Sequence, residues 1–327
     1  MKNPMNLKHF NYGLLSFILG AAIASLIMLL YDYTLPLAKT IRPDRNVIKY
    51  LEDFPQKYQI ISPPIPEAMD FCGERVPLES FYVRERMDRE LIVNTYYHSA
   101  TLLGIKRSNR WFPIIDPILK KNGVPEDFRY LALIESNLEN VISPAGAVGF
   151  WQFTESSAAK YGLEVTSEVD ERYNVERSTQ AACDYLKFAY NRFHSWTLAA
   201  ASYNMGIAGI EKQQERQKVK NYYNLLLGEE TSRYIARILA MKAISKDPQK
   251  YGYLIKPEDL YPVLEYDELK IDSGISNIAD FAKQHNLTYK ILKIYNPWLR
   301  ENSLSVTKGK TYMIKMPKNG TAQPISE

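Results

Sequence analysis

Residues 125–136 read PEDFRYLALIES, and this stretch decides the fold because it joins a helix start to an almost unbroken apolar run. The acidic side chains at positions 126 and 127 suit the positive end of a helix dipole. By helical spacing, one stripe of this segment contains Phe128, Leu131, Ala132, Glu135 and Leu138. We therefore expect a core helix that carries a carboxylate on its packed face.

Glu135 is the carboxylate on that stripe. Low-dielectric surroundings disfavour the charged form of a carboxyl group and raise its pKa, so the group can stay protonated near neutral pH. A protonated carboxyl can donate its proton to a leaving group. Spacing alone equally allows Glu135 to lie at the edge of the stripe, where water or a cation would solvate it. The residue is a candidate general acid, with the solvated edge position as the alternative.

The segment that follows reads SPAGAVGFWQF at residues 143–153. Gly146 and Gly149 permit backbone conformations that let the chain approach another group closely. Trp151 and Gln152 could supply a flat face and an amide for holding a sugar ring. The alternative is a plain corner between helices with Trp151 in the core.

Four ordered motifs over about 100 residues resemble those of the lytic transglycosylases of the soluble-lytic-transglycosylase fold. They are Glu135-Ser136, the segment from Ser143 to Gln152, AASYNMG at residues 200–206 and ETSRYI at residues 230–235. The resemblance implies a mainly α protein with a lysozyme-like helical catalytic domain, whose motif core spans residues 110–245. Ordinary glycosidases use two carboxylates, and this sequence offers no convincing second one.

The resemblance also implies roles for individual residues. Glu135 matches the single catalytic acid and base, and Tyr234 matches the tyrosine whose hydroxyl orients the catalytic carboxyl. The remaining matches are substrate-binding residues of the glycan cleft, namely Ser143, Gln152, Tyr203 and Asn204. Taken singly, a tyrosine on an apolar helix face is usually a core residue, and an asparagine before a glycine can cap a helix.

The activity that the resemblance implies is cleavage of peptidoglycan glycan strands. The bond is the β-1,4 linkage between N-acetylmuramic acid and N-acetylglucosamine, and the product carries a 1,6-anhydromuramoyl end. A lysozyme-type hydrolase and a non-catalytic peptidoglycan-binding scaffold remain the alternatives. The acidic residues Glu164, Glu168, Asp170 and Glu171 are expected to form a solvated surface run.

Composition excludes several other classes of protein. The 327 residues include 41 basic and 37 acidic side chains, and a net charge of +4 does not favour a nucleic-acid partner. Cys72 and Cys183 are too few for a thiol metal cage, and the 4 histidines lie far apart, so we expect no metal and no cofactor. Each cysteine is expected to be a small packed residue, and a disulfide is allowed only if the two meet.

The N-terminal region predicts a membrane anchor. Residues 12–31 carry no charge over about 20 positions, the length of a helix that spans a bilayer. Lys2 and Lys8 precede this run, so the positive-inside rule places residues 1–11 in the cytoplasm. The proline-rich residues 32–65 suit a tether, and the catalytic domain would then face the periplasm of a bacterial envelope. A cleaved signal peptide is the competing interpretation.

The apolar pattern divides the remainder of the chain. Helical spacing continues over residues 66–250, a connector follows at 251–262, and residues 263–317 change to strand, helix, helix and strand before a tail at 318–327. This βααβ order, with Tyr295-Asn296-Pro297 and Gly309 in place, resembles a LysM domain. Such modules bind the N-acetylglucosamine units of peptidoglycan, and a purely structural cap is the alternative.

Overall fold

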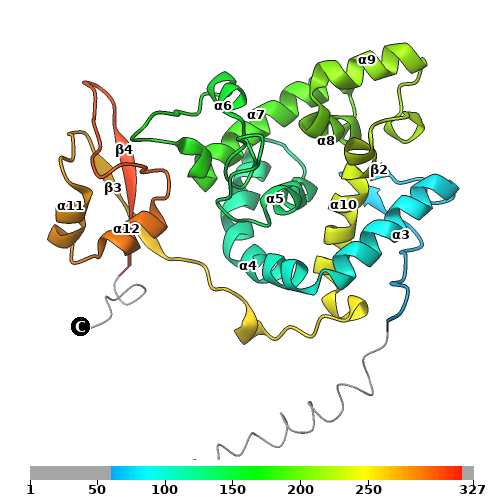
Figure 1. Ribbon diagram of the computed structural model, residues 1–327, viewed down its shortest axis with the longest axis horizontal. Helices are drawn as coiled ribbons and strands as arrows, with labels where there is room; N and C mark the ends of the chain where they lie inside the picture. The colour runs from blue at the N-terminus through cyan, green and yellow to red at the C-terminus, as the bar shows by residue number, and fades with distance from the viewer. Residues whose placement is uncertain (1–59, 319–327) are drawn as a thin grey trace, which may run out of the picture. The chain divides into compact units, whose positions relative to one another are not determined.

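The computed structural model describes residues 60–318, which are mainly helical with two small pairs of antiparallel strands (Figure 1). The first group of helices comprises α3 (Phe81–Tyr96), α4 (His98–Lys121), α5 (Arg129–Ser136), α6 (Glu155–Lys160), α7 (Val175–Phe193), α8 (Trp196–Met205), α9 (Ile207–Gln217) and α10 (Glu229–Lys246). The short strands β1 (Asp70–Phe71) and β2 (Glu74–Arg75) precede them, and the C-terminal part holds β3 (Tyr266–Ile271), α11 (Ile278–Gln284), α12 (Tyr289–Tyr295) and β4 (Tyr312–Pro317). Single 3₁₀ turns are η1 (Glu126–Phe128), η2 (Glu171–Tyr173), η3 (Tyr222–Asn224), η4 (Pro248–Tyr251) and η5 (Pro257–Asp259).

The predicted membrane anchor at residues 12–31 lies outside the described residues, as does most of the tether. Within residues 60–318, no helix has both the length and the apolar character that crossing a bilayer requires.

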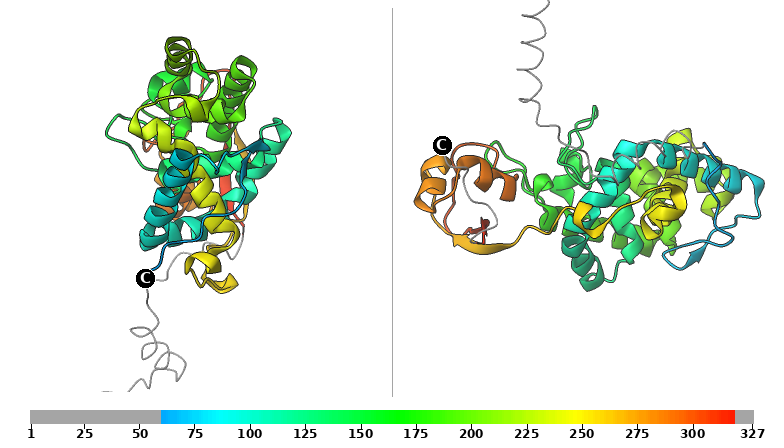
Figure 2. Two further views of the ribbon diagram at one scale, coloured as in Figure 1. Left: turned by 90° about the vertical axis from the view of Figure 1, so that its right-hand side faces the viewer. Right: turned by 90° about the horizontal axis from the view of Figure 1, so that it is seen from below.

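Helix α5 packs between α4 and α10, and α3 lies alongside α10 in both sets of views (Figures 1 and 2). The α3–α10 contact includes an ion pair between the almost fully buried Glu90 and Arg233. Further along α10, Lys242 reaches the carboxylate of Asp127 at 2.6 Å. Separating a buried ion pair would leave an uncompensated charge, so these pairs disfavour movement of α10 relative to its neighbours.

Residues 125–136 are followed by a helix end that comes earlier than their apolar pattern predicted. The helical stretch begins as the 3₁₀ turn η1, continues as α5, and ends at Ser136. Asn137 and Leu138 both have φ of +54°, so the predicted extension of the helical stripe to Leu138 is wrong. Leu138 is nevertheless buried at 2% exposure, because the left-handed turn directs it back into the core.

Residues 266–317 form the LysM-like module, with the predicted order of strand, helix, helix and strand. Strands β3 and β4 pair antiparallel from Tyr266 opposite Pro317 to Ile271 opposite Tyr312. Asn277 and Thr288 cap the two helices through their side chains, as expected for good N-cap residues. The module's apolar interior consists of Ile278, Ala282, Leu292, Trp298, Leu299, Leu304, Tyr312 and Ile314.

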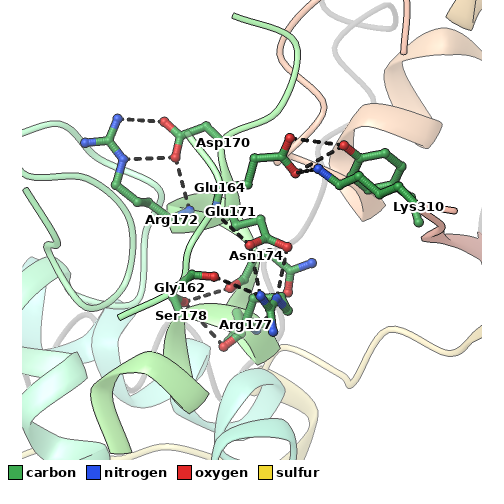
Figure 3. A network of polar contacts seen from close by, with 11 residues as sticks. Gly162, Glu164, Asp170, Glu171, Arg172, Asn174, Arg177, Ser178 and Lys310 are labelled. Carbon is green, nitrogen blue, oxygen red and sulfur yellow. Dashed lines mark hydrogen bonds and ion pairs between the residues drawn. The ribbon is translucent and has the colours of Figure 1, made fainter. Parts of the chain in front are cut away.

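The acidic run at residues 164–171 is not a solvated surface, and that prediction is wrong. Asp170 is 6% exposed and forms a bidentate pair with the guanidinium of Arg172, and Glu171 pairs with Arg177 (Figure 3). Glu164 pairs at 2.7 Å with Lys310 of the C-terminal module. The partner of Glu164 lies more than a hundred positions away in the chain, so local sequence gives no sign of it.

The two cysteines are both free thiols. Cys183 is fully buried within the helical core, and Cys72 packs against the same core. Burial raises the pKa of the Cys183 thiol to about 12. Both side chains therefore act as small packed residues.

Candidate active site

Glu135 lies in the last turn of α5, half-buried, with its carboxylate directed at α10. The phenolic hydroxyl of Tyr234 donates a hydrogen bond to Glu135 Oε1, and Tyr234 itself is fully buried. Burial raises the pKa of the Glu135 carboxyl, while the Tyr234 hydrogen bond and the positive charge of Arg237 act in the opposite direction. Burial is the largest of these effects, so the carboxyl holds its proton to a higher pH than an exposed glutamate does.

The C-terminal end of α5 is fixed to the segment that follows it. Ser136 is buried, and its hydroxyl donates to the carbonyl oxygen of Phe150 at 3.0 Å. Asn137 donates from its side-chain amide to the carbonyl of Ala100 in α4, and Arg107 of α4 donates to the Asn137 carbonyl. The position of Glu135 is thereby set from two sides, by α4 and by residues 142–153.

We call residues 142–153 the catalytic loop because they adjoin Glu135, the candidate general acid. Val148 forms isolated antiparallel bridges with both Ile142 and Phe153, so the loop folds back on itself. Gly149 has φ of +79°, and a Cβ atom at this position would lie 2.1 Å from the carbonyl oxygen of Arg172. Only glycine fits there, which confirms the predicted close approach of the backbone at this position.

Ser143 and Gln152 both stabilise the catalytic loop from within. The Ser143 hydroxyl accepts a hydrogen bond from the backbone N–H of Ala147 at 3.0 Å. The side-chain amide of Gln152 donates to the carbonyl oxygens of Gly149 at 2.8 Å and Val141 at 3.2 Å. Gln152 itself has φ of +50°, a conformation that these two hydrogen bonds help to hold.

Trp151 is a core residue, and the interpretation of its ring as a flat sugar-binding face is wrong. The side chain is fully buried, and the indole Nε1–H donates to the hydroxyl of Thr179 in α7 at 2.9 Å. This contact fixes the middle of the catalytic loop to α7. The alternative given by the sequence, a core tryptophan at a corner, is correct.

Tyr203 and Asn204 lie together at the end of α8 and link it to different elements. The Tyr203 hydroxyl donates to the carbonyl oxygen of Trp151 at 2.8 Å, which secures the catalytic loop. Burial raises the pKa of Tyr203 well above its ordinary value, and the charge of Glu135 adds to the shift. Asn204 donates to the Glu230 carboxylate at 3.0 Å and accepts from the Thr231 hydroxyl at 2.7 Å.

Two charged residues of this site were not assigned a role from the sequence, although Glu230 begins the fourth motif. Glu230 raises the pKa of Glu135 by the repulsion of like charges, and Arg237 lowers it. Arg237 also donates to the carbonyl oxygen of Ile134 at 3.1 Å. Glu230 lies four positions before Tyr234, and Arg237 lies three positions after it. Side chains at these spacings share one helix face, so both residues could have been identified as neighbours of the tyrosine.

The site offers proton transfer and hydrogen bonding. Within residues 60–318, no cluster of three or more histidine, cysteine or acidic side chains could hold a metal ion. The titratable group at the centre of the site is the Glu135 carboxyl, which has a raised pKa and lies between a phenol and a hydrogen-bonded loop. Such an arrangement can act first as a general acid and then as a general base.

Sequence comparison gives two family matches. Residues 112–226 match the transglycosylase SLT domain, and residues 267–320 match the soluble lytic transglycosylase C-terminal LysM-like domain. Membrane-bound lytic murein transglycosylase D of Escherichia coli (strain K12) is 28% identical over 269 residues, which cover 80% of this chain and 58% of that protein. The chain thus spans 58% of the length of this relative.

Two further similarities are more distant. A protein of Alteromonas sp. (strain M-1) named for tributyltin chloride resistance is 27% identical over 209 residues, covering 62% of this chain and 95% of that protein. The solved structure of an inactive mutant of the lytic transglycosylase Slt from Pseudomonas aeruginosa is 15% identical, covers 46% of this chain and 26% of that chain, and has a TM-score of 0.33.

The matched segments include α5, the catalytic loop and α8 in the first domain, and β3 to β4 in the second. The chain therefore carries a transglycosylase SLT domain followed by a soluble lytic transglycosylase C-terminal LysM-like domain.

Proposed function

We propose that the protein is a lytic transglycosylase that cleaves the β-1,4 bond between N-acetylmuramic acid and N-acetylglucosamine in peptidoglycan. The observation that carries the proposal is the environment of Glu135, whose carboxyl has a raised pKa and accepts a hydrogen bond from Tyr234. The SLT match at residues 112–226 and the activity named for the Escherichia coli relative support the same assignment.

In the proposed reaction, protonated Glu135 gives its proton to the glycosidic oxygen. The acetamido oxygen of the muramoyl residue assists at the anomeric carbon as the bond to the leaving sugar breaks. Ionised Glu135 then takes the proton of the C6 hydroxyl on the same sugar ring, and O6 closes onto the anomeric carbon. The product is a 1,6-anhydro ring, the carboxyl regains its proton, and no water is consumed.

One carboxylate is sufficient for this sequence of steps because the nucleophile belongs to the substrate. A well-positioned internal nucleophile can contribute about 7–11 kcal/mol relative to a free one. Tyr234 is assigned to orient the Glu135 carboxyl, and its hydrogen bond stabilises the ionised form that acts as the base. The half-buried residues Ser143, Gln152, Tyr203 and Asn204 are assigned to the walls of the glycan-binding cleft.

The location of the protein is part of the proposal. The uncharged residues 12–31 are assigned to a helix that anchors the chain in the membrane, with the SLT and LysM-like domains on the periplasmic side. The LysM-like module is assigned a contact with peptidoglycan. The Escherichia coli relative is named as a membrane-bound murein transglycosylase, which supports an envelope location.

Mass spectrometry of the products released from isolated sacculi tests the activity. A lytic transglycosylase yields anhydromuramoyl ends, whereas a lysozyme-type hydrolase yields reducing ends that are heavier by one water per cut. A protein that binds sacculi and releases neither product is a scaffold. Either of the last two results contradicts the proposed function.

A further inference from the structure

We propose that the LysM-like module acts as a brace that positions the catalytic loop, in addition to any contact it makes with the cell wall. The proposal rests on the proposed function for its effect on turnover. Its structural basis is the segment 164–173, which contacts the module on one side and the catalytic loop on the other.

Backbone pairing joins this segment to the module. The N–H of Asp170 donates to the carbonyl of Trp298 at 2.9 Å, and the N–H of Arg300 donates to the carbonyl of Glu168 at 2.8 Å. Val169 and Leu299 form the antiparallel bridge between these two bonds. The module therefore adds a short strand-like pairing to the helical domain, which fixes the register of one against the other.

Ion pairs and side-chain hydrogen bonds extend this contact. The Glu168 carboxylate accepts from the Ser303 hydroxyl at 2.5 Å and from the Ser305 N–H at 2.7 Å. In the first turn of α7, Glu176 pairs with Lys315 of β4 at 2.5 Å, and the Lys315 side chain is only 11% exposed. A partly buried pair of this kind is less screened by salt than a surface pair, so it favours one docked arrangement.

The other side of the same segment supports the catalytic loop. The Arg172 carbonyl lies against Gly149, where no Cβ atom would fit. Asp170 holds the Arg172 guanidinium in place (Figure 3). The guanidinium also reaches the carbonyl oxygens of Gly146 and Phe153 at 3.5 Å. Movement of residues 168–172 would therefore displace the backbone of the loop.

Val148 of the catalytic loop completes the connection. It is 4% exposed and belongs to the same apolar cluster as Val169, Trp298 and Leu299, so part of the loop is buried by the module itself. Its N–H and carbonyl both bond to Phe153. Loss of the module from this position would expose Val148 and weaken the pairing that shapes the loop.

A module that positions the catalytic loop and a module that only holds the enzyme on the cell wall predict different kinetics. If the module only holds the enzyme near peptidoglycan, releasing the module from the helical domain changes KM on sacculi. The value of kcat on short soluble glycan strands is then unchanged. If the module positions the loop, kcat on the soluble strands falls, because a small misplacement of groups around a general acid can cost about 100-fold in rate. Binding of the full chain to sacculi would stay within about twofold, because the module itself remains folded.

The test uses the full chain with three substitutions on the helical side of the contact: Glu168→Ala, Val169→Asp and Glu176→Ala. A matched control places the same three changes at exposed positions: Glu258→Ala, Val263→Asp and Glu301→Ala. Amide hydrogen exchange is read at Asp170 and Arg300 for docking, and at Gly149 and Phe153 for the loop. The same preparations are assayed for kcat and KM on soluble glycan strands.

We expect the interface variant to lose protection at all four amides and to show a kcat reduced by about 10- to 100-fold, with the control unchanged. The proposal is overturned if docking is lost while the loop amides and kcat keep wild-type values. It is equally overturned if the amides of Asp170 and Arg300 stay protected, because the contact would then not depend on these residues.

Exchanging the charges of the Glu176–Lys315 ion pair tests the same contact by rescue of kcat. Glu176→Lys and Lys315→Glu should each reduce kcat, and the double variant should recover most of the loss, since the ion pair is restored with its charges exchanged. If the wild-type protein releases no anhydro product at all, the proposed function fails. Hydrogen exchange at the catalytic loop would then still decide whether the module braces it.

Discussion

The hydroxyl of Tyr234 donates a hydrogen bond to Oε1 of Glu135, and the two residues are 99 positions apart in the chain. The tyrosine is fully buried in α10, and the carboxyl is at the end of α5, so packing of these two helices creates the pair. Burial raises the pKa of the carboxyl, and the phenol opposes that shift by stabilising the charged form. Both protonation states of Glu135 are thereby accessible, as a group that first gives and then takes a proton requires.

Replacement of Glu135 by glutamine should abolish turnover without unfolding the protein. The amide has the shape of the carboxyl and can still accept from Tyr234, but it cannot donate an acidic proton. We expect release of anhydromuropeptides from sacculi to fall by at least about 100-fold, within the usual contribution of a general acid. Mass spectrometry measures the products, and circular dichroism verifies the fold. Near wild-type release by the purified variant would refute the assignment of Glu135.

The same variant should be more stable than the wild type at neutral pH. The pKa of Glu135 is raised above 4.5 in the folded state, so ionising it costs folded-state free energy. The cost is absent below the unfolded value and grows as the pH rises from about 4.5 through the folded-state pKa. The stability advantage of Glu135→Gln should therefore appear over this range and persist at higher pH.

Urea unfolding at a series of pH values measures this difference. The exposed Glu258→Gln serves as the control, because its change removes a carboxyl without touching the site. If the stability advantage of Glu135→Gln grew as the pH fell, folding would favour the charged form of Glu135, contrary to the burial effect.

Tyr234→Phe should shift the pH dependence of activity towards higher pH. Removing the phenol deletes a hydrogen bond that favours the ionised carboxyl, so the pKa of Glu135 rises further. The alkaline limb of kcat/KM reports the group that must be protonated in the free enzyme, and it should move with that pKa. Tyr203→Phe is the matched control, since the Tyr203 hydroxyl donates to the Trp151 carbonyl and not to Glu135. An unmoved limb in Tyr234→Phe would argue against Glu135 as the titrating acid.

Glu230→Gln should move the alkaline limb of kcat/KM towards lower pH. Its negative charge raises the pKa of Glu135, so the neutral amide lowers that pKa. Glu230 is exposed, and we expect the shift to be smaller than that of Tyr234→Phe and to diminish with added salt. The neighbouring Glu229→Gln controls for removing an exposed carboxylate from the same helix turn. Shifts of equal size in both variants would assign the effect to net charge alone.

Gly149→Ala should destabilise the protein far more than Gly146→Ala. Both glycines have positive φ, but an added Cβ would lie 2.1 Å from the Arg172 carbonyl at position 149 and would meet nothing within 4 Å at position 146. We expect a loss of about 3–5 kcal/mol for the first and about 1–2 kcal/mol for the second, because only the first adds a steric clash to backbone strain. Denaturant midpoints measure the two values. Equal losses would mean that the loop does not approach residue 172 this closely.

Local sequence patterns determined much of the secondary structure and domain order of this protein. The apolar stripe before Glu135 and the change to alternating residues near β4 predict a helical domain and a small βααβ module from the sequence alone. The motifs predict which segments gather at the site, and glycine at position 149 predicts a close backbone approach that the structure confirms. These features could be recognised because helical period, strand alternation and backbone freedom depend on neighbouring residues.

Tertiary structure decided what the acidic and aromatic side chains do. Trp151 is a core residue, α5 ends before Leu138, and the acids at 164–171 hold an interface in place of a solvated face. Whether a carboxylate is solvated, paired or kept protonated depends on groups that lie about a hundred positions away. Burial and charge pairing are properties of the packed molecule, so only the folded structure could distinguish the half-buried carboxyl at 135, whose pKa is raised, from the ion-paired carboxylate at 164.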